Sequence, residues 1–145
     1  MKRIAVYGVV LVRDSSVVVA SKAADSPAAA ADILRTYIGR VDREHLVVLL
    51  VDSRRQVIGI NTVSIGTVSA SLLHPREVYK PAVLLGAAAV VLGHNHPSGD
   101  PLPSIEDKEA TRRLVRAGEL MGIPLLDHVI IGNENHFSFR ERGLL

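Results

Sequence analysis

The sequence predicts a single α/β domain in which a mixed β-sheet lies between helices. Three observations favour this fold class. Apolar runs of strand length alternate along the chain with longer stretches of helical periodicity. The length of 145 residues fits one domain. Hydrophobic residues make up 48% of the chain but aromatic residues only 3%, so Val, Leu, Ile and Ala must build the core, and Val-rich runs favour strands.

The first 25 residues are expected to form a hairpin that packs on the domain. Two apolar runs, residues 4–12 and 17–20, are joined by the polar segment 13–16, which is a hairpin or meander pattern. The first run is too short to span a membrane and lacks a small-residue cleavage pattern. We therefore expect a strand there rather than a signal peptide or an anchor.

Serine, proline and glycine delimit the first expected helix. Ser26 suits the N-cap, Pro27 the first helical position and Gly39 the C-terminal stop. Farther along, continuous apolar runs predict strands buried on both faces, and helical periodicity predicts two more helices. In order, the further expected elements are a strand at 46–51, its antiparallel partner at 57–63, an extended or irregular segment at 66–73, a helix at 75–86 weakened by Pro81, a strand at 87–92, a loop at 93–103, a helix at 104–121, a strand at 125–131 and a final strand at 136–139.

The composition excludes several kinds of chemistry and partner. A net charge of +2, with the Lys and Arg residues scattered, does not indicate a nucleic-acid partner for this domain. The absence of cysteine excludes disulfides and thiolate metal ligands and is compatible with the cytoplasm. No apolar run approaches the roughly 20 residues that span a bilayer. We therefore expect a cytoplasmic protein without a membrane segment.

Two histidines lie where a buried strand is expected to end. His94 and His96 are separated by one residue, and side chains at i and i+2 of an extended chain point to the same face. Both imidazoles can therefore approach one metal ion. Asp107 follows eleven residues after His96, near the start of the next helix. Two histidines and one carboxylate form a catalytic zinc arrangement, whose fourth position holds a water with a pKa brought down to roughly 7.

Ser104 and Asp107 also match a purely structural pattern. Residues 104–107 have the Ser-x-x-acid signature of a helix start, and such a capping pair needs no metal. The histidines, in strand–loop–helix order with Pro97 at the turn, favour the metal site over the cap alone. In that site Ser104 could present its hydroxyl beside the metal and stabilise a developing oxyanion.

Three more polar residues have open roles. Glu44 is the candidate proton shuttle, provided that the strand it leads into lies beside the strand that carries the histidines; the alternative is a solvated glutamate in a charged surface turn. Asp127 and His128 interrupt an otherwise apolar strand. Either one of them orients a metal-bound histidine, or the two residues face opposite sides of the sheet and one of them is buried and hydrogen-bonded.

The combination of His94-Asn95-His96-Pro97 with Ser104 and Asp107 resembles the JAMM (MPN+) metalloprotease family, in particular its RadC-like (UPF0758-type) branch. The family pattern is an upstream Glu, then His-x-His-Pro, six residues, Ser, two residues and Asp, and every one of these positions is matched. Similarity extends to residues 74–77, 93–101 and 126–132, and it covers roughly residues 26–145. Many relatives carry an N-terminal helix-hairpin-helix region, which this chain is expected to lack.

The resemblance implies an MPN (JAB)-type α/β/α sandwich around a curved mixed sheet, similar to that of cytidine deaminases, over residues 1–145. It implies one zinc ion held by His94, His96 and Asp107, with water as the fourth ligand. By the same resemblance, Ser104 stabilises the tetrahedral intermediate and Glu44 activates the water. The implied activity is hydrolysis of a peptide or isopeptide bond in a protein or peptide substrate.

Two other functions stay open alongside the hydrolase. One is a DNA-repair-associated accessory protein, as the name of the RadC-like branch suggests, and the other is a non-catalytic protein-interaction domain. The exposed edges of a small mixed sheet are compatible with a homodimer. No membrane partner is expected.

Overall fold

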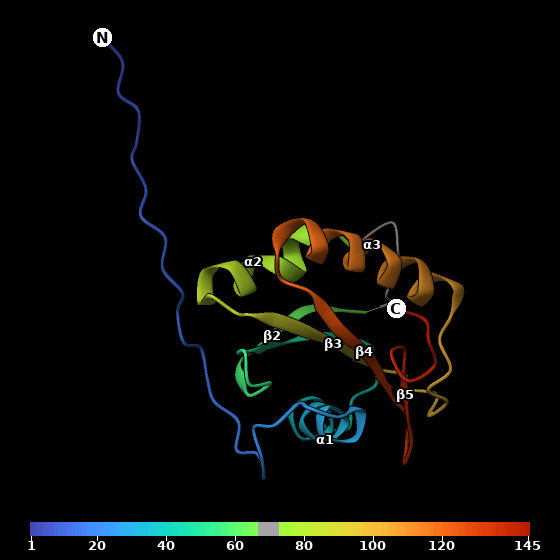
Figure 1. Ribbon diagram of the computed structural model, residues 1–145. Coiled ribbons are helices and arrows are strands. Elements are labelled where there is room, and N and C mark those ends of the chain that lie inside the picture. Colours follow the sequence, from blue (N-terminus) through green and yellow to red (C-terminus); the bar gives the residue numbers. More distant parts are fainter. Residues whose placement is uncertain (67–72) are drawn as a thin grey trace.

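The computed structural model describes residues 1–66 and 73–145, and it contains a five-stranded sheet between two layers of helices (Figure 1). The strand order is β2-β1-β3-β4-β5; β3 and β4 are parallel and the other neighbours are antiparallel. The α/β/α sandwich with a mixed sheet is confirmed. The elements are α1 (Pro27–Ile38), β1 (His45–Val51), β2 (Val57–Ile65), α2 (Pro75–Leu85), β3 (Ala89–Asn95), α3 (Ile105–Met121), β4 (Leu125–Ile131) and β5 (His136–Ser138).

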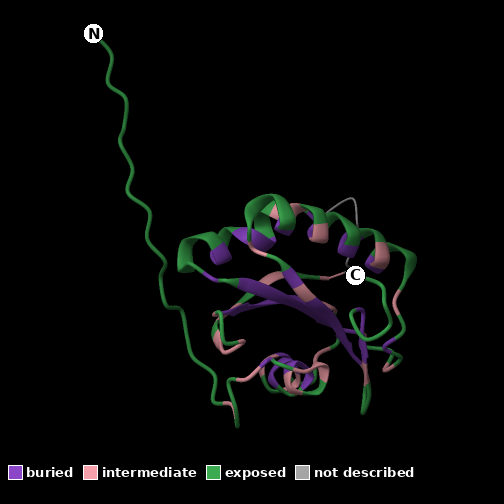
Figure 2. Cartoon of the chain, in the orientation of Figure 1, coloured by how far each residue is buried: buried purple, intermediate pink, exposed green. Residues whose placement is uncertain are grey.

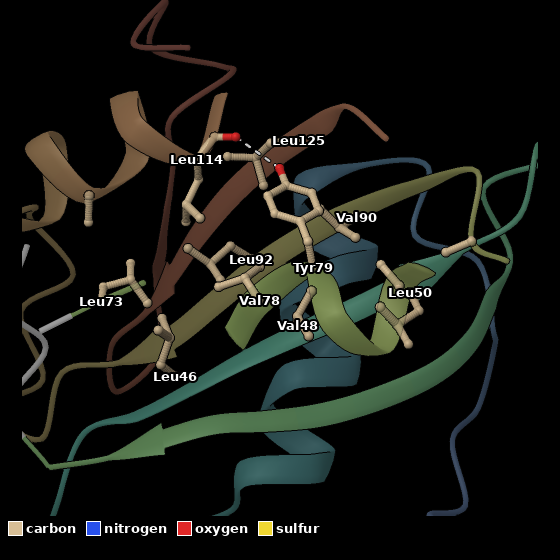
Figure 3. Close-up of a cluster of buried hydrophobic side chains, with 13 residues drawn as sticks. Leu46, Val48, Leu50, Leu73, Val78, Tyr79, Val90, Leu92, Leu114 and Leu125 are labelled. Atoms are coloured by element: carbon tan, nitrogen blue, oxygen red, sulfur yellow. Dashed lines mark hydrogen bonds between the residues drawn. The ribbon is translucent and has the colours of Figure 1, made fainter. Parts of the chain in front are cut away.

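The two central strands, β1 and β3, are buried on both faces, as their continuous apolar runs predict. One face packs against α1, and the other packs against α2 and α3. Figure 3 shows the second of these cores, in which Leu46 and Leu92 lie beneath the two helices. The hydroxyl of Tyr79 on α2 donates a hydrogen bond of 2.9 Å to the backbone carbonyl of Leu114 on α3, so the two helices are also joined by a polar contact.

Helix α1 has the ends that the sequence predicts, and it lies very close to β3. The Ser26 side chain accepts a hydrogen bond from the backbone N–H of Ala29, and the chain leaves the helix at Gly39. A Cβ atom on Gly93 would lie 2.3 Å from a methyl carbon of Leu34 on α1. A side chain at position 93 would therefore force Leu34 to move, and glycine permits the close approach of helix and strand one residue before His94.

Several boundaries differ from those expected. Strand β3 continues to Asn95 instead of ending at residue 92, because β1 pairs with it as far as His94 and β4 pairs with it as far as Asn95. Pro81 lies inside α2 without breaking it. Most of the segment expected to be extended or irregular, residues 66–73, lies outside the described residues. No helix in the described ranges is long and apolar enough to cross a lipid bilayer.

The N-terminal hairpin is a wrong prediction. Residues 1–18 are exposed, contain no strand and run as an extended segment away from the sandwich (Figures 1 and 2). The chain first joins the body at Val19, which packs against the core on the α1 side of the sheet, and Ala23 then forms an isolated antiparallel bridge with Gln56. A two-stranded hairpin that buries no apolar face against other elements is marginally stable in water, so the local pattern alone does not hold the two runs together.

Candidate metal centre

The strand carrying the histidines and the helix carrying Asp107 meet at the carboxyl end of β3. His94 is the penultimate residue of β3, and His96 follows the strand immediately. The chain then turns through a short loop and enters α3, where Asp107 occupies the first turn. His94 lies on the same face of the sheet as Leu92, which packs beneath α2 and α3, so its imidazole points toward the start of α3.

Three side chains present ligand atoms to one point. The Nε2 atoms of His94 and His96 are 3.0 Å apart. Asp107 Oδ1 lies 3.3 Å from Nε2 of His94, and Asp107 Oδ2 lies 3.3 Å from Nε2 of His96. The side chains of His94 and Asp107 are 0% and 3% exposed, whereas that of His96 is 13% exposed. The group is therefore closed on its inner side and reached from the side of His96.

Hydrogen bonds determine which nitrogen of His94 carries its proton. The Thr111 hydroxyl donates to the backbone carbonyl of Asp107 at 2.7 Å, so it can only accept from Nδ1–H of His128, 2.7 Å away. His128 Nε2 is then an acceptor, and His94 Nδ1–H must donate to it across 2.8 Å. His94 Nε2 therefore bears no hydrogen and directs a lone pair at His96 and Asp107.

His96 reaches the same tautomer by a different bond. Its Nδ1 lies 2.8 Å from the backbone carbonyl of Asp100, and because a carbonyl can only accept, Nδ1 carries the proton. The loop that supplies this carbonyl is fixed by two backbone bonds, from His96 N–H to Ile131 and from Gly99 N–H to His96. Gly99 has a φ of 88°, a conformation that favours glycine. Nε2 of His96 is thus also free to bind a cation.

The charges within the group depend on one another. Burial alone would raise the pKa of Asp107, but the two imidazoles of His94 and His96 that face its carboxylate hold that pKa well below its usual range. The carboxylate of Asp107 in turn raises the pKa of His96, because it favours the protonated form of that imidazole. Burial lowers the pKa of His128 far below its usual range, so His128 is neutral. An ionised carboxylate thus faces two imidazoles.

This donor set fits a divalent metal ion. Zinc binds imidazole nitrogen and carboxylate oxygen at about 2.0–2.2 Å in a tetrahedron, which places neighbouring ligand atoms about 3.3–3.6 Å apart. The Nε2 atoms of His94 and His96 are 3.0 Å apart, each lies 3.3 Å from one of the two oxygens of Asp107, and one ligand atom from each of the three residues lies within 4.8 Å of the others. Within the described residues, His94, His96 and Asp107 form a group that could hold a metal ion. The predicted convergence of these three side chains is observed.

Ser104 is the N-cap of α3, and both interpretations of residues 104–107 apply in part. Its side chain accepts a hydrogen bond of 3.0 Å from the backbone N–H of Asp107, and Asp107 Oδ2 accepts one of 2.8 Å from the backbone N–H of Ser104. The capping box thus exists, and it uses the same carboxylate that faces the histidines. The Ser104 hydroxyl serves the cap as an acceptor, which leaves its own hydrogen for another partner.

Glu44 lies at the same edge of the sheet, because β1 does run beside β3. The antiparallel register pairs Leu46 with His94, so two further residues along each chain bring Glu44 opposite His96. Asn95 holds this stretch in place: its Oδ1 accepts from His45 N–H at 2.7 Å and its Nδ2 donates to the Arg43 carbonyl at 3.0 Å. Glu44 is half-buried, and after the larger effect of Asp107 its charge also raises the pKa of His96. A fully solvated turn residue does not fit this placement.

Some residues of the centre were not identified from the sequence. Of the pair Asp127 and His128, the structure places His128 against His94, while Asp127 binds the Ser138 hydroxyl and the backbone N–H of Arg140. Thr111 was not considered, although its position four residues after Asp107 puts it on the same helix face. Asn95 was also missed, since its role depends on the pairing of β1 with β3.

Comparisons with known proteins agree with this description. The family model of the RadC-like JAB domain matches residues 24–144. A UPF0758 protein of Rubrobacter xylanophilus is 53% identical over 120 residues, which are 83% of this chain and 52% of that protein. UPF0758 protein STH371 of Symbiobacterium thermophilum is 51% identical over 120 residues, covering 83% and 51%. The chain therefore spans about half the length of these curated relatives.

Proposed function

Because the chain belongs to the RadC-like JAB domain family, we propose that it is a zinc-dependent metallohydrolase that cleaves peptide or isopeptide bonds. The observation that carries the proposal is the convergence of two proton-free imidazole nitrogens and an ionised carboxylate on one point, with separations of 3.0–3.3 Å. A carboxylate that only caps a helix does not require two histidines beside it that each direct an unprotonated nitrogen toward it.

His94, His96 and Asp107 would hold the ion. Bound zinc would supply Lewis-acid polarisation of a carbonyl oxygen and would make water acidic enough to ionise near neutral pH. The inner side of the group is sealed by burial of His94 and Asp107, so water and substrate approach from the side of His96. The ligand set, with three protein groups, leaves room for a reacting molecule.

Glu44 is assigned the proton transfers. The register of β1 and β3 brings Glu44 near the level of His96, and in this role its carboxylate would take a proton from the attacking water and return it to the leaving amine. Ser104 is assigned the developing oxyanion, since its hydroxyl hydrogen is not used by the cap and can be donated. The helix N-terminus at Ser104 adds a favourable positive potential at the same place.

The test combines metal content with hydrolysis of a peptide library and a ubiquitin-like isopeptide conjugate. The wild-type chain should bind one zinc ion and hydrolyse a member of these sets. Glu44→Gln should keep the zinc and lose activity by about 10²-fold or more. Glu106→Gln, an exposed charge change of the same kind on α3, should alter neither property.

Asp107→Asn tests the metal ligand separately, because it should lose the zinc together with the activity. A wild-type chain that takes up no zinc even in excess would refute the metal centre. A Glu44→Gln variant that hydrolyses substrate as fast as the wild type would refute the assigned role of Glu44.

A further inference from the structure

An apolar segment near the start of the chain lies fully in solvent. Residues 4–12, here called the arm, have the sequence Ile-Ala-Val-Tyr-Gly-Val-Val-Leu-Val. The large side chains among them are 45–97% exposed. Figure 2 shows the whole segment as exposed and remote from the sandwich. A contiguous apolar surface of this kind marks a contact site, because water does not stabilise it.

The composition of the arm is that of a buried strand. It contains no charged residue and is rich in β-branched side chains, which favour extended structure. Charges stand at both of its ends, with Arg3 before it and Arg13 and Asp14 after it. Charged residues that flank an uncharged strand limit its pairing to the segment between them.

The sheet has one long edge that can receive such a strand. β2 forms this edge, and its nine residues, Val57–Ile65, carry no charge. Exposed edges are usually blunted by lysine, proline or a cover of other elements. Ile58 and Ile65 are instead 45% and 58% exposed. The opposite edge, β5, has only three residues and cannot match the nine of the arm.

The edge of β2 already accepts one short antiparallel contact. The backbone N–H of Val57 donates to the carbonyl of Lys22 at 2.8 Å, and the N–H of Ala24 donates to the carbonyl of Arg55 at 2.9 Å. Beyond this bridge, no strand in the described part of the chain pairs with the outer edge of β2. Residues 58–65 therefore offer their outward backbone groups to a further strand.

We propose that the arm of one copy of this chain pairs with the free edge of β2 in a second copy, so that reciprocal exchange of arms forms a homodimer. The arm extends away from its own sandwich and is therefore accessible to a second molecule (Figure 1). The nine residues of the arm match the nine of β2. Two-fold exchange buries both arms and both edges, which is the closed arrangement of most homodimers.

The oligomeric state tests the proposal first. Light scattering coupled to size exclusion, at micromolar concentration, should give the mass of a dimer for the wild type. Val9→Lys in the arm and Ile58→Lys on the edge should each give a monomer with an unchanged circular dichroism spectrum, since neither side chain is in the core. The control Leu120→Lys, at an exposed apolar position of α3, should remain a dimer.

Cross-linking distinguishes a second copy from the chain's own edge. The wild type has no cysteine, so single cysteines can be placed by Val9→Cys and Ile58→Cys in two chains with different affinity tags. A short bis-maleimide should join the two tagged chains when they are mixed. A cross-link formed within a chain carrying both substitutions, a monomeric wild type, or a dimer that survives both lysine variants would each overturn the proposal.

Discussion

Replacing Thr111 by Val removes one hydroxyl from the chain of hydrogen bonds behind His94. Val keeps the shape of Thr, so the packing under α3 is preserved. His128 Nδ1–H then has no acceptor at a position that is fully buried. The imidazole of His128 can escape by moving its proton to Nε2, but it must then donate to Nδ1 of His94. That tautomer of His94 carries its proton on Nε2, where the metal would bind.

The expected loss follows from these two alternatives. If the variant binds zinc with His128 protonated on Nδ1, that buried N–H has no acceptor. If His128 is protonated on Nε2 instead, both imidazoles must change tautomer before Nε2 of His94 can bind zinc. A buried unsatisfied group costs about 1–3 kcal/mol. At about 1.4 kcal/mol for each factor of ten, the zinc Kd should rise roughly 5- to 150-fold. This matches the typical 10- to 100-fold effect of losing a partner that orients a metal-bound histidine.

The assay is competition for zinc between the protein and a chromophoric chelator at pH 7.5. Thr111→Ser is the matched control, because it keeps the hydroxyl and removes only a methyl group; its zinc Kd should stay within a few-fold of the wild type. If Thr111→Val binds zinc as tightly as the wild type, or if Thr111→Ser is equally impaired, the hydrogen-bond account of the His94 tautomer is wrong.

Other predictions concern stability. Gly93→Ala should lower the free energy of unfolding in urea by about 1–3 kcal/mol, because its Cβ would lie 2.3 Å from Leu34. If Gly93→Ala lowers this free energy equally in the Leu34→Ala variant, which lacks the clashing methyl carbon, the explanation is wrong. Burial raises the pKa of Tyr79 to about 12. Its contribution to stability should be complete below the unfolded-state pKa of about 10 and lost toward pH 12, and Tyr79→Phe should abolish that dependence. Ser104→Ala should destabilise the metal-free protein by about 1 kcal/mol through loss of the cap, and an unchanged urea midpoint would argue against it. Removal of zinc by a chelator should leave the circular dichroism spectrum intact, because the apolar cores do not include the ligands.

The sequence predicts the convergence of the three candidate ligands because they belong to two consecutive elements. A strand end, a short loop and a capped helix suffice to bring His94, His96 and Asp107 to one edge of the sheet. The position of Glu44 needed one fact that no local pattern contains, namely that β1 lies beside β3. The role of Thr111 could not be predicted for a similar reason, because its partner His128 lies on β4 and local sequence does not show that the two residues meet.

The N-terminal prediction failed for a related reason. Two apolar runs, at residues 4–12 and 17–20, are compatible with a hairpin. The pattern specifies only that these segments need a partner. It does not say whether the partner is the other run, the body of the same chain or a second molecule. Strand propensity reflects the surface on which a strand packs, and that surface is set by tertiary or quaternary structure.

Acid is expected to oppose metal binding at His96, because of the groups that surround this histidine. His94 is oriented by His128, whose pKa is lowered by burial, so this support stays neutral and keeps accepting through Nε2 as the pH falls. His96 is supported by a backbone carbonyl and faces Asp107, which raises the pKa of His96. Since a metal ligand must be unprotonated, protons compete for His96 at a higher pH than for an ordinary histidine. Acid is therefore expected to weaken metal binding at His96, the partly exposed residue on the side where substrate would enter.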